Sequence, residues 1–400
     1  MDTLITVLRM AELLLLAYLL ASSLYFLFFA LAASFYHERS SGQKLVPSRV
    51  LILLPAYKED AVILETAEAA ARHISARHDI QALVLADSLR AETVAQLRKG
   101  PARVLEVAFA NSTKAKSIRR GLETVSESFD YVVILDADNV MAPGCVDALV
   151  ERLQSGYRVV QGQRTAKNIN TDFAILDGIS EGVNNAIFRT GHRVVGLSAS
   201  LIGSGFACEL PLFRELMARA EAVGGFDKEL ELFLLSQKIT IGYARKAVIY
   251  DEKIQQADAF VHQRRRWLSA QLVYFSRHAG KALGALIRQG KVDYFDKVVQ
   301  FVLPPRVIAL GLAGLPAIGY ALYTLLTAQV SWWALLWWLA FLAVVTAILI
   351  SIPAQWFSRK TLRSLLRLPQ GFWLTLKALF RLKGANKKFI HTEHGIDKQK

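Results

Sequence analysis

Long uncharged stretches at both ends of the chain predict three membrane-spanning helices. Residues 13–36 contain no charged side chain, and a helix of this length can cross a bilayer, which takes about 20 residues. A cleaved signal peptide is the alternative, because Ala30-Leu31-Ala32 resembles a cleavage site. The apolar stretch is too long for a signal core, which favours a retained span. Residues 307–358 are likewise uncharged and predict two spans joined by a turn near 327–331.

Between these stretches, residues 48–267 show the pattern of a folded α/β domain. Short runs of β-branched and aliphatic residues alternate with segments that have helical spacing. The apolar runs are RVLILLPAY at 49–57, QALVLADS at 81–88, ARVLEVAF at 102–109 and YVVILDADN at 131–139, with helices expected from about Asp60 and Lys114. Buried strands that alternate with helices are typical of a mostly parallel, Rossmann-like sheet covered by helices.

Two further segments mix apolar and basic side chains and predict helices that lie on the membrane surface. Aromatic and aliphatic residues are interspersed with arginine and lysine in 268–300 and again after 359. The sequence thus predicts five parts: 1–47 with the first span, 48–267 as the α/β domain, 268–300 as amphipathic interfacial helices, 301–358 with two spans, and 359–400 as a basic amphipathic tail.

The distribution of charge indicates which side of the membrane each part occupies. The chain is 53% hydrophobic, and its 48 basic and 34 acidic side chains give a net charge of +14. Residues 359–400 hold 11 basic and 2 acidic side chains directly after an apolar span, so an anionic membrane lipid surface explains the excess better than nucleic acid does. The inward bias of basic residues predicts a multi-pass protein of the cell (inner) membrane, with the α/β domain and the tail cytoplasmic.

Polar side chains follow several of the predicted strands at the point where each strand ends. They are Tyr57 and Glu59 after the first run, Asp87 after the second, and Asp136 with Asp138 after the fourth. In open α/β sheets, ligands bind beyond the carboxyl ends of parallel strands. These residues therefore predict a ligand site at this rim of the sheet.

Asp136 and Asp138 form an Asp-x-Asp pair that could hold Mg²⁺ or Mn²⁺. Carboxylate oxygens are the ligands such cations prefer, and the cation would neutralise a diphosphate leaving group. A strand-end turn or a helix cap explains the isolated pair equally well, and the buried run before it favours the metal. There is no P-loop motif, and Gly203-Ser204-Gly205 lacks the third glycine of a dinucleotide fold, so these glycines would instead let the backbone approach a ligand.

The acidic residues at 227 and 229 are candidates for a general base. The segment DKELEL places Asp227 and Glu229 at the start of a predicted helix, where either carboxylate could face the metal site and take a proton from an acceptor. Acidic charge that complements the helix dipole is an equally good explanation. The sequence alone leaves both explanations and both residues open.

The segment QRRRW places Gln263, Arg264 and Arg266 close to Trp267. A basic run ahead of a hydrophobic segment is usually a topology signal, which explains the charge but not the spacing of Gln263 and Trp267. Guanidinium groups bind phosphate through paired hydrogen bonds, and an indole face stacks on sugar rings or guanidinium groups. Together with the acidic pair, this segment predicts transfer from a nucleotide diphosphate sugar.

These motifs resemble those of the membrane-bound family-2 glycosyltransferases of GT-A fold, the group of the cellulose, chitin and hyaluronan synthases. The resemblance covers about 50–271 and extends in layout to the flanking spans. Its motifs in this chain are PAYKED from Pro55, LADS with Asp87, STKAKSIRRGL with Lys114, DAD from Asp136, GSGFA from Gly203, DKELEL from Asp227 and QRRRW from Gln263.

The resemblance implies a role for each matched residue. The donor nucleotide would be held by Tyr57, Glu59, Asp87, Lys114 and Asp136, the metal by Asp136 and Asp138, and the diphosphate and acceptor by Gly203, Ser204, Gly205, Gln263, Arg264, Arg266 and Trp267. The family's Thr-Glu-Asp is replaced here by Asp227-Lys228-Glu229. Glu229 therefore takes the position of the base, with Asp227 as the substitute.

The activity that the resemblance implies is an inverting glycosyl transfer from a UDP-sugar. An acceptor hydroxyl, deprotonated by Glu229, would attack the anomeric carbon and form a β-linkage. The acceptor would be a growing polysaccharide or, alternatively, a lipid that receives one sugar, as in the ceramide glucosyltransferases. Three spans are few to enclose a polymer channel, which a homo-oligomer or an export subunit could complete, whereas QRRRW favours the polysaccharide. An inactive sugar-nucleotide sensor is disfavoured, because every acidic position of the pattern is filled.

Overall fold

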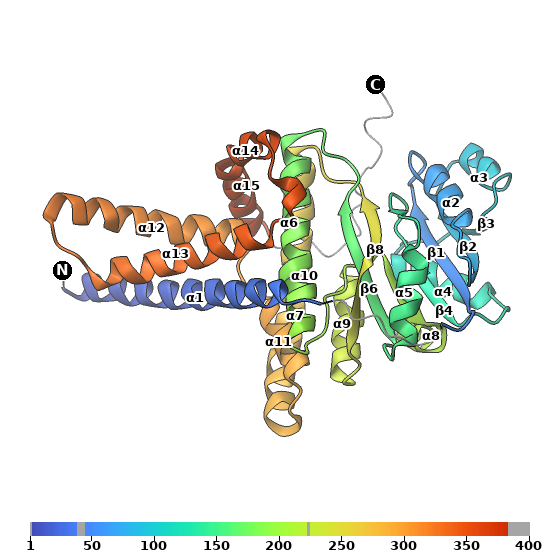
Figure 1. The fold of residues 1–400 in the computed structure, drawn as a ribbon, viewed down its shortest axis with the longest axis horizontal. Helices are drawn as coiled ribbons and strands as arrows, with labels where there is room; N and C mark the ends of the chain where they lie inside the picture. The colour runs from blue at the N-terminus through green and yellow to red at the C-terminus, as the bar shows by residue number, and fades with distance from the viewer. Residues whose placement is uncertain (1, 38–44, 222–224, 383–400) are drawn as a thin grey trace.

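The computed structural model describes residues 2–37, 45–221 and 225–382. These residues form three parts that follow one another along the long axis of the molecule (Figure 1). A bundle of apolar helices lies at one end and the α/β domain at the other. A layer of helices that run across this axis lies between them.

Three helices of the described chain are long and apolar enough to cross a membrane: α1 (Asp2–Ser34), α12 (Arg306–Thr327) and α13 (Trp332–Ser351). They confirm the expected candidate spans, although α1 begins well before the uncharged stretch. The helices pack side by side, and the Glu12 carboxylate of α1 accepts hydrogen bonds from Tyr320 Oη (2.7 Å) and Trp337 Nε1 (3.1 Å). A carboxylate is tolerated within an apolar bundle when donors such as these face it.

The α/β domain is built on an eight-stranded sheet with the order β3-β2-β1-β4-β7-β6-β8-β5. The strands are β1 (Arg49–Tyr57), β2 (Asp79–Asp87), β3 (Arg103–Val107), β4 (Tyr131–Ile134), β5 (Val140–Met141), β6 (Val159–Ala166), β7 (Phe206–Glu209) and β8 (Ile241–Asp251). From β3 to β4 the strands are parallel, as expected. In the other half, β7 is antiparallel to both neighbours and β5 to β8, while β6 and β8 are parallel. The sheet is therefore mixed.

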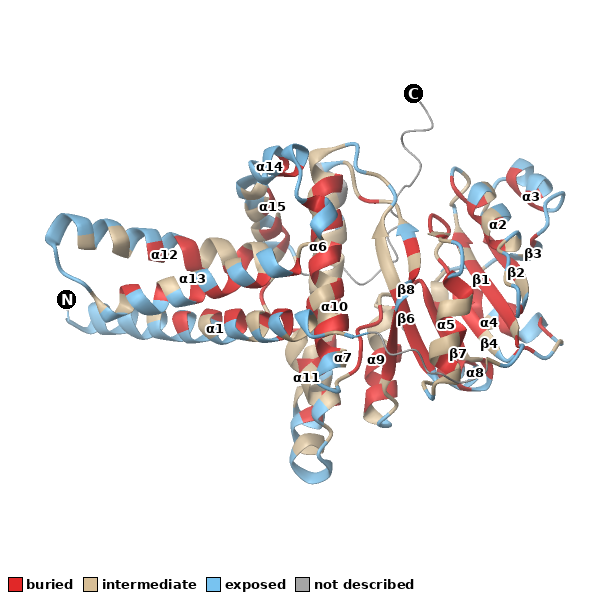
Figure 2. Cartoon of the chain, in the orientation of Figure 1, coloured by how far each residue is buried: buried red, intermediate tan, exposed pale blue. Residues whose placement is uncertain are grey.

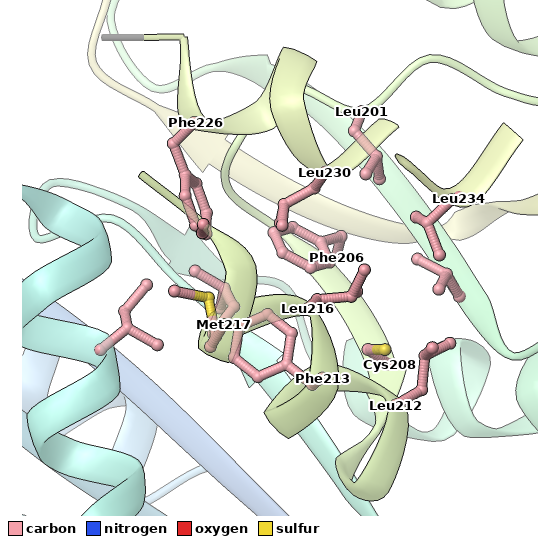
Figure 3. Close-up of a cluster of buried hydrophobic side chains, with 14 of the residues drawn as sticks. Leu201, Phe206, Cys208, Leu212, Phe213, Leu216, Met217, Phe226, Leu230 and Leu234 are labelled. Atoms are coloured by element: carbon pink, nitrogen blue, oxygen red, sulfur yellow. The ribbon is translucent and has the colours of Figure 1, made fainter. Parts of the chain in front are cut away.

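Both faces of the sheet are buried, because successive residues of β1 point to opposite sides. Val50, Ile52 and Leu54 pack against α2 (Ile63–Ala71) and α5 (Cys145–Gln154), with Leu97 of α3 (Ala91–Leu97) nearby. On the opposite face, Leu51 belongs to the cluster formed with α4 (Lys114–Thr124), α8 (Leu210–Arg219) and α9 (Phe226–Ser236). Figure 2 shows the strands as the most continuous buried region, and Figure 3 shows the second cluster around β7, α8 and α9.

The layer between the sheet and the spans consists of helices from three separate regions of the sequence (Figure 1). They are α6 (Asp172–Asn184), a π-helical turn (Asn185–Gly191), α7 (His192–Val194), α10 (Ala257–Gln289), α11 (Val292–Gln300), a 3₁₀ turn (Ala354–Trp356), α14 (Arg359–Leu365) and α15 (Leu368–Phe380). The boundary expected at 267/268 falls inside α10, which is one continuous helix. The part of the predicted tail from 383 onward lies outside the described residues.

A buried group of charged side chains joins this layer to the sheet. Glu181 of α6 pairs with Arg164 of β6 (3.0 Å) and with Arg189 of the π-helical turn (3.0 Å). Asp251 of β8 pairs with Lys253 (2.6 Å) and with Arg164 (3.5 Å). We call these five residues the ion cluster. Burial acts to raise the pKa of Glu181, but the three cations outweigh it and hold this pKa far below its ordinary value.

The membrane helix α1 approaches the π-helical turn closely at Gly191. A Cβ atom added at this glycine would lie 2.1 Å from the backbone oxygen of Phe29. We expect Gly191→Ala to destabilise the protein by about 1–3 kcal/mol, because two backbones would have to separate. The matched control is Gly280→Ala in α10, where a Cβ meets no atom within 4 Å. Thermal unfolding in detergent should show a lower midpoint for Gly191→Ala only, and equal midpoints would contradict the packing described here.

The ion cluster predicts a specific dependence of stability on pH. Because the folded-state pKa of Glu181 lies below its unfolded value near 4.5, its stabilisation is complete above that value and declines as the pH falls below it. Glu181→Gln should lower stability at pH 7 by about 3–5 kcal/mol, since three buried cations lose their shared carboxylate. It should also lose stability less steeply than the wild type between pH 4.5 and 3.

The control for this prediction is Glu68→Gln, because Glu68 pairs with Arg72 on the surface of α2. Unfolding midpoints of both variants and the wild type are to be measured at each pH. If the wild type and Glu181→Gln lost stability in parallel below pH 4.5, the assigned charge state of Glu181 would be wrong.

Candidate active site

A single cleft of the described chain contains most of the residues that the sequence motifs singled out. It begins at the carboxyl ends of β1 and β4 and extends past the start of α9 to α6, α10 and α11. The predicted site residues that line it are Tyr57, Glu59, Lys114, Asp136, Asp138, Gly203, Asp227, Gln263, Arg264, Arg266 and Trp267. Four predicted site residues do not line it: Asp87, Ser204, Gly205 and Glu229.

The Asp-x-Asp pair follows β4 directly and its two carboxylates differ in environment. Asp136 is paired with the ammonium group of Lys114, which also donates to the backbone oxygen of Gly203 (2.6 Å). Asp138 is buried, and its two oxygens accept from Asn139 Nδ2 (3.0 Å) and from the backbone amide of Glu252 (3.2 Å). Both oxygens of Asp138 are therefore held by neighbouring hydrogen-bond donors. Asp136 is instead held by the ammonium group of Lys114.

The loop Gly203-Ser204-Gly205 is held in place by hydrogen bonds to buried residues behind the cleft. Both glycines have positive φ angles, +77° and +63°, which glycine adopts without steric cost. Ser204 Oγ donates to Asn139 Oδ1 (2.6 Å) and accepts from the backbone amide of Asp136 (2.9 Å), so it is buried behind the Asp-x-Asp turn. Gln161 Nε2 donates hydrogen bonds to the backbone oxygens of Ser204 and Gly205 (both 3.0 Å). Only Gly203 reaches the cleft.

Asp87 is buried at the end of β2 and organises the residues beside the cleft. Its carboxylate accepts hydrogen bonds from the hydroxyls of Ser88 (3.0 Å), Ser112 (3.0 Å) and Ser117 (3.3 Å). Ser112 and Ser117 flank the start of α4, which carries Lys114, and both line the cleft. Asp87 thus acts on the cleft through these serines in this structure.

The two base candidates point in opposite directions from α9, because residues two apart on a helix lie on opposite faces. Asp227 faces the cleft across from Gly203, where an added Cβ would lie 3.6 Å from Asp227 Cβ. Glu229 instead accepts from the backbone amide of Glu221 (3.1 Å) and lines a second hollow between α8, α9, α10 and α11. The structure therefore brings Asp227, and not Glu229, to the Asp-x-Asp pair.

Asp227 has cationic neighbours that keep it ionised. Lys228 Nζ lies 3.2 Å from Asp227 Oδ2. Burial acts to raise the pKa of Asp227, but Lys228 and, more weakly, Lys297 hold it below its ordinary value. A base of low pKa accepts a proton efficiently only when a bound acceptor displaces such a counterion.

The QRRRW segment lies in the first turns of α10 and spreads its cations over two sides of the cleft. Arg264 pairs with Asp177 of α6 (3.0 Å), and its guanidinium carbon lies 5.0 Å from the Trp267 ring centroid. Burial lowers the pKa of Arg266, while Asp227 and Asp136 oppose this shift, so Arg266 feels both carboxylates at once. Arg264 therefore contacts the indole, and Arg266 lies within electrostatic reach of the two acids.

Several residues of the cleft carry no motif in the sequence. Lys297 and Gln300 enter from α11, and Arg164, Glu181 and Arg189 from the ion cluster. The sequence offered no motif for these residues, because the contacts that bring them to the cleft include pairs from distant parts of the chain, such as Lys297 with Glu231. Glu231 itself lies in the DKELEL motif, and because it follows Asp227 by four residues it lies on the same face of α9.

The donor set of the cleft suits a divalent cation that binds together with a phosphate. In the described chain, no group of three or more His, Cys, Asp or Glu side chains could hold a metal without another partner. Mg²⁺ is commonly bound by one or two carboxylates, with substrate phosphates and water completing the shell. Asp136 and Asp138 match that pattern.

Solved structures that are similar to this chain include glycosyltransferases. A mannosyltransferase from Pyrobaculum calidifontis in complex with GDP-Man and Mn²⁺ matches with 13% identity and a TM-score of 0.50, covering 84% of this chain and 96% of that one. Glucosyl-3-phosphoglycerate synthase from Mycobacterium tuberculosis, in complex with Mn²⁺, UDP and phosphoglyceric acid, matches with 20% identity and a TM-score of 0.38, covering 53% of this chain and 73% of that one. The first similarity establishes the fold.

The sequence itself gives the family. No curated protein matches the chain significantly. A family model described as "Glycosyltransferase like family 2" matches residues 47–270, which is more than half of the chain and contains every predicted site residue. This match, together with the sheet and the cleft at its rim, shows that the chain belongs to the glycosyltransferase-like family 2.

Proposed function

We propose that the protein is an inverting, metal-dependent hexosyltransferase that moves a sugar from a UDP-sugar to a growing polysaccharide at the cytoplasmic face of the cell membrane. One observation carries the proposal: Arg266, Asp136 and Asp227 line one cleft, and both carboxylates act on the pKa of Arg266. A cation that can bind phosphate thus shares the cleft with the proposed metal ligands and the proposed base. Glycosyl transfer from a nucleotide sugar needs these groups around a single anomeric carbon.

The donor would bind at the end of the cleft where strands β1 and β4 finish. Tyr57 ends β1 and Glu59 follows it, and both would contact the uridine, while Asp87 would act through Ser112 and Ser117. Lys114 is the natural partner for the nucleotide end, since its ammonium group already lies between Asp136 and the Gly203 backbone. A diphosphate arriving there would compete with Asp136 for this cation.

A divalent cation fits beside the diphosphate. Asp138, with Asp136, would hold Mg²⁺ or Mn²⁺, and when bound the cation supplies positive charge that stabilises the leaving UDP. The Mn²⁺ in the complex of the Pyrobaculum calidifontis mannosyltransferase supports this assignment. On the protein side, Arg266, Arg264 and Gln263 would contribute further contacts to the diphosphate.

Asp227 is proposed as the general base in place of Glu229. An acceptor hydroxyl would displace Lys228 from Asp227 and donate its proton to Oδ2 as its oxygen attacks the anomeric carbon. The new carbon–oxygen bond forms while the bond to UDP breaks, and UDP leaves with the bonding electrons. A single displacement of this kind inverts the configuration and gives a β-linkage from an α-linked donor.

A single-addition glycolipid synthase remains the second candidate, because the cleft extends to α11 beside the membrane spans. Lys297, Gln300 and Phe301 line that end, and Tyr18 of α1 donates a hydrogen bond to the backbone oxygen of Val302 (2.6 Å). A lipid acceptor could therefore present its head group from the bilayer. For either acceptor, the indole of Trp267 would lie against the receiving sugar or head group.

The first test combines a donor panel with product sizing. Purified protein with Mn²⁺ or Mg²⁺ should release UDP from one of a panel of UDP- and GDP-sugars, and chelation of the cation should abolish release. After a short radiolabelled pulse, a ladder or a high-mass smear supports polysaccharide synthesis, whereas a single extractable lipid product supports the glycolipid alternative. Asp138→Asn is the inactive control, and release at the wild-type rate by this variant would contradict the metal assignment.

The second test separates the two base candidates. Asp227→Asn should lower kcat by about 10²–10⁴-fold, because the acceptor hydroxyl loses its proton acceptor, with little change in the donor KM. Glu229→Gln is the matched control two residues along α9, and its kcat should stay within about 3-fold, since a change away from the site costs little. The opposite pattern, in which only Glu229→Gln loses turnover, would return the base to Glu229.

A further inference from the structure

A buried ion pair connects the proposed catalytic helix α9 to α11. Glu231 and Lys297 lie 2.7 Å apart with both side chains almost fully buried. The ammonium group of Lys297 also donates to Ser200 Oγ (2.7 Å) and to Gln300 Oε1 (2.8 Å), so all three of its protons have acceptors. Glu231 Oε1 in turn accepts from the backbone amide of Leu201, two residues before Gly203.

Hydrogen bonds continue from Lys297 to the membrane helix α1. Gln300 uses its amide group to donate to Asp296 Oδ2 (2.8 Å) and contacts His192 Nε2 (3.0 Å). Tyr25 of α1 donates to the other oxygen of Asp296 (2.8 Å). We call this series, from Tyr25 through Asp296, Gln300 and Lys297 to Glu231, the polar chain.

His192 closes the polar chain on the side of the π-helical turn. Its ring is fully buried and stacks on Phe29 of α1, with ring centroids 3.7 Å apart. Its Nδ1 lies 2.6 Å from the backbone oxygen of Ile187. Its Nε2 lies close to Gln300 Nε2 (3.0 Å), Tyr25 Oη (3.0 Å) and Asp296 Oδ2 (3.2 Å), so His192 contacts three members of the polar chain.

The polar chain ends one helical turn from the proposed base. Glu231 follows Asp227 by four residues on α9, so anchoring Glu231 fixes the direction of Asp227. The start of α9 has no side-chain cap: its first residue follows Gly225, which has a φ of +74°. Contacts from α11 therefore contribute to holding this end of the helix against the cleft.

We propose that Lys297 is a positioning residue for the transfer reaction: by pairing with Glu231 it fixes α9, and with it Asp227. The place of Lys297 is set in turn by Gln300 and Asp296, which connect it to Tyr25. Turnover therefore depends on the hydrogen bond that Tyr25 of the membrane helix α1 donates to Asp296 of α11. This inference rests on the proposed role of Asp227.

Burial makes the Glu231–Lys297 pair sensitive to change. Burial raises the pKa of Glu231, and Lys297 opposes this shift. Removing the lysine would leave a buried carboxylate without its counterion, which either takes up a proton or turns toward water. Either response moves α9, and a displacement of about 1 Å at a reacting group can cost about 100-fold in rate.

The test begins with Lys297→Met and Lys297→Arg in the full-length protein. Lys297→Met should lower kcat by about 10–100-fold while the donor KM and the binding of UDP stay near their wild-type values, since the polar chain touches α9 and not the donor. Lys297→Arg retains the charge and should restore most of the lost turnover. Loss of donor binding in parallel with kcat, or an unfolded Lys297→Met with no rescue by arginine, would show a structural role and overturn the proposal.

The membrane end is tested with two tyrosines of the same helix. Tyr25→Phe removes the hydrogen bond to Asp296 and should lower kcat by about 3–10-fold, the equivalent of one hydrogen bond. The matched control is Tyr18→Phe, which removes a hydrogen bond from α1 to the backbone of Val302, outside the polar chain. Tyr18→Phe should leave kcat unchanged, and equal effects of the two changes would contradict the inference.

A double variant and the base variant complete the experiment. Tyr25→Phe combined with Lys297→Met should lower kcat less than the product of the single effects, because both break one chain. Multiplicative effects would mean that the two residues act independently. If Asp227→Asn abolishes turnover but Lys297→Met and Tyr25→Phe do not reduce it, only this inference fails; if Asp227→Asn remains active, the proposed base fails first.

Discussion

The neutralisation of Glu181 by three buried cations is the interaction on which the arrangement of the molecule depends. Arg164 of β6 and Arg189 of the π-helical turn come from elements that flank α6 in the sequence, whereas Lys253 comes from the distant segment after β8. An ion pair of this kind is strongly destabilised when one partner is lost, because the other charge stays buried. The sheet and the layer of helices between the sheet and the spans are consequently held in a fixed position relative to each other, and the cleft lies where they meet.

The same physical constraint determines the character of the cleft. Its cations already have carboxylate partners: Lys114 with Asp136, Lys228 with Asp227, Arg264 with Asp177, and Lys297 with Glu231. A nucleotide diphosphate bound in this cleft, as we propose, would therefore exchange ionic partners with these pairs. Such exchange favours ligands that bring both phosphate and a cation, since each protein charge then regains an opposite charge.

Much of the fold could be predicted from the pattern of apolar residues. The run 49–57 is buried on both faces, as its unbroken hydrophobic character indicated, and the uncharged stretches coincide with α1, α12 and α13. The antiparallel insertion of β7 was not visible, because hydrophobic pattern does not encode strand direction. The continuity of α10 was missed for a related reason: the change from a charged to an amphipathic surface marks a change of environment and not the end of a helix.

In the candidate site, too, residues that belong to short sequence motifs could be predicted, whereas residues placed by contacts distant in the sequence could not. Asp136, Asp138 and the QRRRW segment come from motifs whose neighbours are close in sequence, and the structure brings them to one cleft. The choice between Asp227 and Glu229 depends on the rotation of α9, which follows from packing of its buried leucines against the sheet. Lys297 pairs with Glu231, and Arg164 with Asp251, across more than 60 residues, and no single stretch of sequence records such contacts.

The length of α10 links the cleft to helices that pack far from it. At about 1.5 Å per residue, its 33 residues form a rod about 50 Å long without a proline to bend it. Trp267 lies within the first third of this helix, and α11 and α15 both pack against it. Because a straight helix of this length moves as one body, we expect a change in the packing of α11 or α15 to be felt at Trp267 as well.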